Sequence, residues 1–151
     1  MDVEPVRRAV LHALELAQED IEKWCGNLSE TEMFAQPYSL PSVAFQLRHI
    51  ARSLDRLLTY ADGEQLNADQ IAALKSEMEP GSAADVMQEV REGLYLAIKR
   101  VCAFSPEQFA EPCGVGKKML PTTVVGLLIH CADHTQRHIG QMVTTVKVLR
   151  A

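Results

Sequence analysis

The stretch that decides the fold is His130-Cys-Ala-Asp-His134-Thr-Gln-Arg-His138-Ile-Gly-Gln141, in which three histidines recur every four residues. Apolar residues around it repeat at steps of three and four, which predicts a long helix over residues 121–149. Because residues four apart lie above one another on a helix, the three imidazoles share one side of it. They follow one border of the apolar stripe, where a packed helix faces the cleft beside its neighbour.

The same apolar periodicity predicts three more long helices, over residues 3–24, 41–61 and 83–103. Capping sequences and a first-turn proline predict short helical turns at residues 29–32, 67–78 and 105–108. Two prolines and two glycines between residues 111 and 121 predict an irregular loop. No segment shows a strand pattern. The expected fold is therefore all-α, a four-helix bundle with short extra turns in its connections.

The composition limits the kinds of protein this chain can be. A length of 151 residues predicts a single domain, residues 1–151, and 47% hydrophobic with 23% charged residues is typical of a soluble globular protein. A net charge of -5 argues against a nucleic-acid partner. No run approaches the roughly 18 apolar residues of a membrane span, and the acidic start lacks signal-peptide character, so a cytoplasmic protein is expected. Four cysteines without CxxC spacing are expected to be free thiols.

A fourth histidine lies on the second predicted helix. At about 100° per residue, His49 falls beside the apolar stripe of that helix. It shares this flank with Gln46, Ser53, Arg56 and Tyr60. Three other polar residues are predicted to face water: Arg48, Arg52 and Asp55. Two helices therefore offer histidines to one cleft, which is where helical bundles build ligand sites.

These histidines suit a divalent metal ion. Neutral imidazole is a common ligand of first-row metals, and a pair four residues apart can bind one ion while a third ligand comes from another helix. Three imidazoles leave a coordination position open for water or a thiolate, as in catalytic sites. The alternative is that histidines four apart are ordinary residues of a helix border. His12, on the first helix, is interpreted in that way.

Taken together, His49 in Phe45-Gln-Leu-Arg-His49-Ile-Ala-Arg-Ser53 and the His130-x3-His134-x3-His138-Ile-Gly-Gln141 run resemble the DinB/YfiT-like family of four-helix-bundle metalloenzymes. In that family a histidine midway along the second helix and a late His-x3-His pair ligate a divalent ion, and a Gly-Gln step follows. The resemblance extends over nearly the whole chain in helix order and spacing. It implies that His49, His134 and His138 are the metal ligands and that His130 lies beside them or in the pocket.

One position departs from the family. Its members often carry His-His-Arg-Gly-Gln around the last ligand, whereas this chain has Arg137-His138-Ile139-Gly140. The usual arginine therefore has no counterpart at that position, and a substrate contact made by it is not implied. Metal binding is unaffected by this change on chemical grounds.

The resemblance implies thiol chemistry as the first functional hypothesis. Relatives in the family include S-transferases and an isomerase that use low-molecular-weight thiols such as bacillithiol, mycothiol or glutathione. The ion, with zinc or nickel expected, would activate a thiol cofactor for transfer to a small-molecule electrophile. Residues on the flanks of the cleft would bind a carboxylate or carbonyl of that cofactor or line the pocket: Arg56, Gln141 and Ser53.

Two other hypotheses stay open. The first is a hydrolase that uses metal-bound water, although the nearby carboxylates Asp55 and Asp133 are predicted on exposed sides of their helices. The second is a non-catalytic protein whose histidines line a ligand pocket or a dimer interface. Exposed helix faces make a homodimer reasonable. Cys131, one turn from His134, is interpreted as a small buried apolar residue rather than a ligand.

Overall fold

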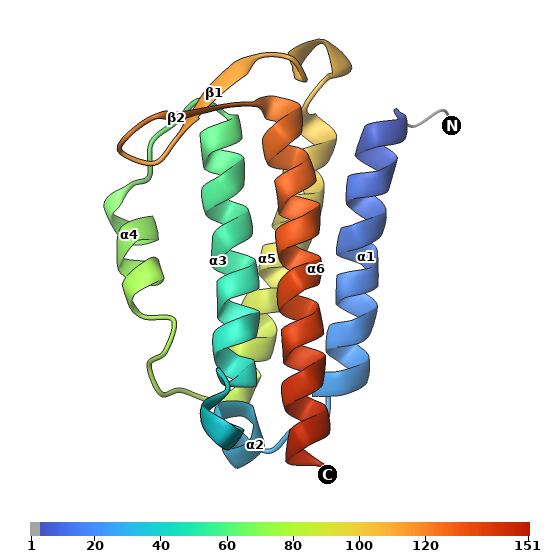
Figure 1. The fold of residues 1–151 in the computed structure, drawn as a ribbon, viewed down its shortest axis with the longest axis vertical. Coiled ribbons are helices and arrows are strands. Elements are labelled where there is room, and N and C mark those ends of the chain that lie inside the picture. The colour runs from blue at the N-terminus through green and yellow to red at the C-terminus, as the bar shows by residue number, and fades with distance from the viewer. Residues whose placement is uncertain (1–3) are drawn as a thin grey trace.

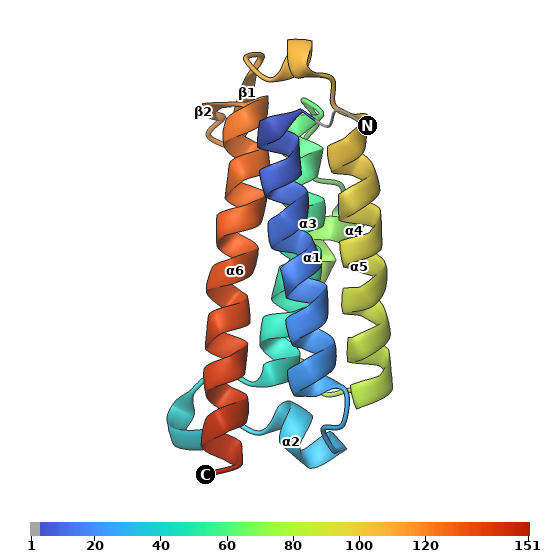
Figure 2. The ribbon, with the colours of Figure 1, turned by 90° about the vertical axis from the view of Figure 1, so that its right-hand side faces the viewer.

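The structure is a computed structural model that describes residues 4–151, and most of this chain is helical. Figures 1 and 2 show four long helices side by side: α1 (Pro5–Cys25), α3 (Val43–Ala61), α5 (Ala83–Ala103) and α6 (Val124–Leu149). Short elements join them: α2 (Glu30–Phe34), α4 (Ala68–Lys75) and two 3-10 turns at Pro37–Ser39 and Pro106–Gln108. The mostly helical fold predicted from the apolar periodicity is confirmed.

The long helices run in two directions. In Figures 1 and 2, α1 and α6 run one way while α3 and α5 run the other. Helix α6 packs against both α1 and α3, and α3 also packs against α5. Because α3 and α5 are parallel, the chain between them must return along the length of α3. This return, residues 62–82, carries α4, which packs beside α3.

Side-chain caps set where the helices begin, and those of the two short helices lie where the sequence predicted them. Ser42 accepts a hydrogen bond from the backbone N–H of Phe45 at 3.0 Å, and capping boxes start α2 at Ser29 and α4 at Asn67. These caps satisfy backbone donors that have no partner inside the helix. The predicted start of the first helix, residue 3, lies outside the described residues, and α1 begins at Pro5.

The prediction of an irregular loop over residues 111–121 is wrong. Two short strands, β1 (Pro112–Val115) and β2 (Leu120–Thr123), pair antiparallel there, with Val115 opposite Leu120. Each strand of a two-stranded ribbon keeps a free edge, where proline is tolerated. Gly116 turns the chain with a φ of +74°. Because β2 extends to Thr123, the last helix begins at Val124 and not at residue 121. The fold is therefore not purely α.

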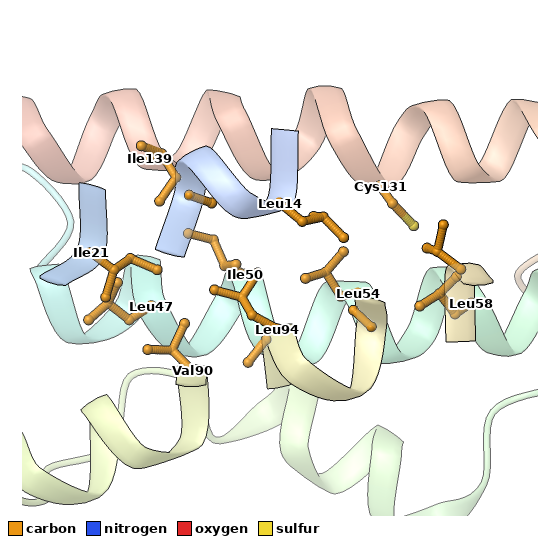
Figure 3. Packing of buried hydrophobic residues seen from close by; sticks show 14 of the residues in the cluster. Leu14, Ile21, Leu47, Ile50, Leu54, Leu58, Val90, Leu94, Cys131 and Ile139 are labelled. Carbon is orange, nitrogen blue, oxygen red and sulfur yellow. The ribbon is translucent and has the colours of Figure 1, made fainter. Parts of the chain in front are cut away.

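The apolar stripes of the four long helices meet in one core. Figure 3 shows buried side chains from α1 and α6 pointing toward those of α3 and α5. The labelled members of this core are Leu14, Ile21, Leu47, Ile50, Leu54, Leu58, Val90, Leu94, Cys131 and Ile139. Helices α3 and α5 approach each other closely at Gly93, where an added Cβ would lie 2.7 Å from the Cβ of Ala51. Within residues 4–151, none of the helices has the length and apolar character of a membrane span.

The prediction that Arg48 faces water is also wrong. Its side chain is buried, because the return segment and α2 cover that face of α3. The guanidinium donates to the backbone carbonyls of Glu77 and Glu79 and lies over the Phe34 ring, 5.5 Å from its centroid. Arg52 is likewise engaged, in an ion pair of 2.7 Å with Glu89 of α5. The contacts of Arg48 hold Glu77 and Glu79 against the side of α3.

Candidate metal centre

Helices α3 and α6 bring three histidines together. His49 of α3 and His134 and His138 of α6 each offer one ring nitrogen, and these three atoms lie within 4.8 Å of one another. The Nε2 atoms of His49 and His134 are 3.3 Å apart. The ring centroid of His138 lies 4.4 Å from that of His49 and 4.5 Å from that of His134.

The position of these residues on α6 explains why they converge. Thr135 and Ile139, on the core side, are buried, while Asp133 and Arg137, on the other side, are exposed. The histidines between these two sides are half-buried and border the groove between α6 and α3. One helical turn separates the last two, so both rings project toward α3.

Hydrogen bonds orient two of the three rings. Nδ1 of His49 lies 2.9 Å from a carboxylate oxygen of Glu77, and Nδ1 of His138 lies 2.6 Å from Oε1 of Gln46. An oxygen acceptor keeps the ring hydrogen on Nδ1, so Nε2 retains its lone pair. Partners of this kind fix the tautomer and orientation of metal-binding histidines.

The electrostatic environment keeps two of the histidines neutral. Burial, followed by the positive charge of His138, His49, His130 and Arg137, lowers the pKa of His134 to about 4. Burial, followed by His49 and Arg137, lowers the pKa of His138 to about 4 as well, although Glu77 acts in the opposite direction. Both imidazoles are therefore uncharged at neutral pH, which is the form that binds metal ions.

Glu77 is the site residue that the sequence did not reveal. It follows α4, in the return segment, and its side chain is buried. Burial alone would raise the pKa of this carboxyl, but the hydrogen bond with His49 and the charges of His49 and Arg56 outweigh burial and lower it. The carboxylate is therefore ionised. Its position in Ser76-Glu-Met-Glu-Pro80, beyond the periodic part of the short helix, gave no signal of a contact with α3.

Ser53 and Arg56 lie in this network with Glu77. Nη1 of Arg56 is 3.3 Å from Glu77, and its Nη2 donates to Ser53 Oγ at 3.0 Å. Ser53 Oγ is also 3.4 Å from Nε2 of His49. Arg56 is thus directed at Glu77, and its guanidinium is already engaged by two side chains.

The other predicted site residues lie at the edge of the histidine cluster. His130 has its ring centroid 5.4 Å from that of His134, and its Nδ1 lies 2.9 Å from a carboxylate oxygen of Asp133; both side chains are about half exposed. Gln141 accepts a hydrogen bond of 3.0 Å from Gln46. The Cys131 thiol is buried in the core, and burial raises its pKa to about 12, so it offers no thiolate.

The donor set fits a divalent ion. Two nitrogens bound tetrahedrally to one zinc ion at about 2.0–2.1 Å would lie roughly 3.3–3.4 Å apart, close to the separation of 3.3 Å between the His49 and His134 nitrogens. Neutral imidazoles suit zinc, nickel, cobalt and iron alike. With three protein ligands, such a site resembles catalytic rather than structural metal sites, which have four.

Comparison with protein families places this sequence beside known relatives. The sequence profile of the DinB superfamily matches residues 13–142, a span that contains all three clustered histidines. No curated protein matches the chain.

Proposed function

Because this chain belongs to the DinB superfamily, we propose that it is an enzyme whose His49, His134 and His138 hold a divalent metal ion. We also propose that its four long helices form a four-helix bundle of the DinB/YfiT-like type. The observation that carries the proposal is the convergence of three imidazoles, two of them with Nε2 freed by a hydrogen bond at Nδ1.

The surrounding residues prepare this site for a metal. A divalent ion, when bound, supplies Lewis-acid chemistry and lowers the pKa of a thiol or water that it contacts. Glu77 holds the His49 ring and places one negative charge beside the three imidazoles. Arg56 binds the other oxygen of Glu77, and so keeps this carboxylate ionised and directed at the ring.

Thiol-dependent S-transfer is the reaction that we propose. Hydrolysis commonly needs a general base whose pKa lies near the working pH. Glu77 is the carboxylate nearest the cluster, but His49 and Arg56 engage it and its pKa is lowered. This supports a reaction in which the nucleophile is a thiol, which loses its proton more readily than water does.

Metal content tests the site. Protein purified without a histidine tag should contain stoichiometric divalent metal, and a His134→Ala/His138→Ala double variant should contain almost none. His130→Ala is the matched control, because it removes a histidine from the same helix outside the cluster, and it should keep its metal. Equal metal content in the wild type and the double variant would overturn the proposal.

The reaction needs a separate assay. Protein loaded with zinc, nickel, cobalt or iron would be incubated with a panel of low-molecular-weight thiols and chlorodinitrobenzene. We expect thiol consumption that depends on the metal and disappears in the double variant. Metal-dependent cleavage of esters or amides without thiol consumption would show a hydrolase instead.

A further inference from the structure

A cavity of about 490 Å³ lies next to the metal centre, between the start of α3 and the second half of α6. Its walls include Leu40, Pro41, Gln46, Arg137, Gln141 and Thr144. Gln46 connects this cavity to the histidine cluster, because its side-chain amide lines the cavity and also contacts His138. This volume is within the range of small-molecule sites. A smaller cavity of about 220 Å³ between α3 and α5 includes Arg52 and Glu89, which already pair with each other.

A chain of hydrogen bonds determines which groups the cavity presents. If His138 gives Nε2 to a metal, Nδ1 keeps its hydrogen and donates to Oε1 of Gln46. The amide nitrogen of Gln46 then donates to Oε1 of Gln141 at 3.0 Å. Gln141 consequently has its amide N–H groups left, and within residues 4–151 these have no hydrogen-bond partner. Gln141 therefore adds donors to the cavity.

Arg137 adds a positive charge. Its side chain is exposed on α6 beside His138, and it forms no ion pair or hydrogen bond with any residue from 4 to 151. Residues 35–54, which include the facing wall, contain no Asp or Glu. The hydroxyls of Thr144 and Thr145 donate to backbone carbonyls of α6. The free donors of the cavity are thus the guanidinium and the Gln141 amide.

The backbone just before the cavity wall is strained. Tyr38 and Ser39, immediately before Leu40, have φ of 51° and 64°, in the left-handed region that non-glycine residues seldom adopt. Residues held in this region often lie beside binding sites. The two strained residues lead directly into Leu40 and Pro41, which line the cavity.

We propose that this cavity binds a carboxylate of a reactant, with Arg137 pairing to the carboxylate and Gln141 donating to it. The rest of the reactant lies against Leu40 and Pro41 and extends toward the histidines. This proposal rests on the proposed metal-dependent transfer. It replaces Arg56, whose guanidinium is engaged by Glu77 and Ser53, with Arg137 as the group that recognises the anion.

The first test measures binding without a metal and without turnover. Metal-free protein would be titrated with 4-phenylbutyrate and with 4-phenylbutyramide, which differ only in the charged group, while NMR follows the Arg137 Nε–H and Gln141 amide signals. We expect the acid to bind about tenfold more tightly than the amide, because a charge-assisted pair is worth more than a neutral hydrogen bond. Arg137→Gln should abolish that preference. Lys147→Gln, which removes a cation of α6 outside the cavity, should retain it.

Equal affinity for the acid and the amide in the wild type would overturn the proposal, whatever the metal content. An Arg137→Gln variant that keeps the preference would overturn it too. Loss of the proposed function is a separate outcome: protein that binds no metal but still prefers the acid would disprove the metal enzyme and leave the carboxylate site standing.

A second test identifies which reactant carries the carboxylate. In metal-loaded protein, Arg137→Gln should raise KM for that reactant and leave kcat nearly unchanged, since the contact is remote from the reacting sulfur. Comparing 3-mercaptopropionate with its methyl ester tests the thiol, and comparing 4-chloro-3-nitrobenzoate with its methyl ester tests the electrophile. A variant with unchanged KM for both acids would contradict the proposal.

Discussion

A carboxylate oxygen of Glu77 lies 2.9 Å from Nδ1 of His49, so a residue of the return segment orients an imidazole on α3. Arg56 contacts the other oxygen of the same carboxylate at 3.3 Å. The three side chains form one chain of contacts that ends at the cluster of metal-ligand candidates. Metal affinity should therefore depend on residues outside the three histidines.

Replacing Glu77 tests this dependence directly. In Glu77→Gln the amide oxygen can still accept from His49, but the negative charge is lost. Metal affinity should fall about 10–100-fold, the usual effect of removing such a partner. Competition with a chromophoric chelator measures it. Glu79→Gln, an exposed neighbour on the same segment, should bind metal as the wild type does, and equal losses in both variants would mean that the effect is only one of net charge.

Arg48 should affect both stability and metal binding, although it touches no histidine. Its guanidinium donates to the carbonyls of Glu77 and Glu79, and Arg48→Ala leaves the buried Glu77 carbonyl and the partly buried Glu79 carbonyl without these donors. We expect a loss of about 1.5–3 kcal/mol in the free energy of unfolding and weaker metal binding, because Glu77 is no longer held. Urea unfolding and metal titration measure the two effects. Wild-type metal affinity in the variant would show that Glu77 is positioned independently of Arg48.

Acid should destabilise the metal-free protein through His134 and His138. Their pKa in the folded state is about 4, below the ordinary value of 6.5, so the unfolded chain binds more protons between these limits. Stability from these groups is complete above pH 6.5 and falls as the pH decreases toward 4. Urea unfolding between pH 7 and 4.5 should show a shallower decrease in a His134→Gln/His138→Gln variant. Identical slopes would contradict the lowered pKa values.

Two glycines should respond in opposite ways to alanine. At Gly93, an added Cβ would lie 2.7 Å from the Cβ of Ala51, so α3 and α5 must move apart, at a cost of about 1–3 kcal/mol. At Gly140, an exposed position of α6, no atom lies within 4 Å of the added Cβ. There alanine should stabilise the helix by up to about 1 kcal/mol. Thermal unfolding of both variants measures the contrast, and a neutral Gly93→Ala would show that the helices separate easily.

Periodicity predicted the long helices and the histidine positions because both depend on angles around single helices. A residue four positions from another shares its face wherever the helix is packed. The sequence pattern therefore predicts that His49, His134 and His138 lie at helix borders without any information on contacts between helices. The caps at Ser29 and Asn67 were predictable for the same reason, since each involves a backbone group only three residues ahead.

The missed features depend on what covers each helix. Arg48 and Glu77 meet only because the return segment runs along α3, and no spacing within α3 indicates that another segment covers that face. The β-ribbon was missed for a different reason. Its four-residue strands contain glycine and proline, which are common in loops. The antiparallel pairing between residues 112–115 and 120–123 leaves no periodic pattern of apolar residues in the sequence.

His49 and His134 are separated by 85 positions in the chain, yet their ring nitrogens lie 3.3 Å apart. An ion shared between them would act as a reversible cross-link that closes this long loop. In the unfolded chain, closing a loop of that length costs about 4–5 kcal/mol in entropy by the chain model used for disulfides. Metal loading should therefore make the backbone amides of α3 and α6 exchange with deuterium more slowly and together, so that the topology of the fold becomes sensitive to the supply of metal.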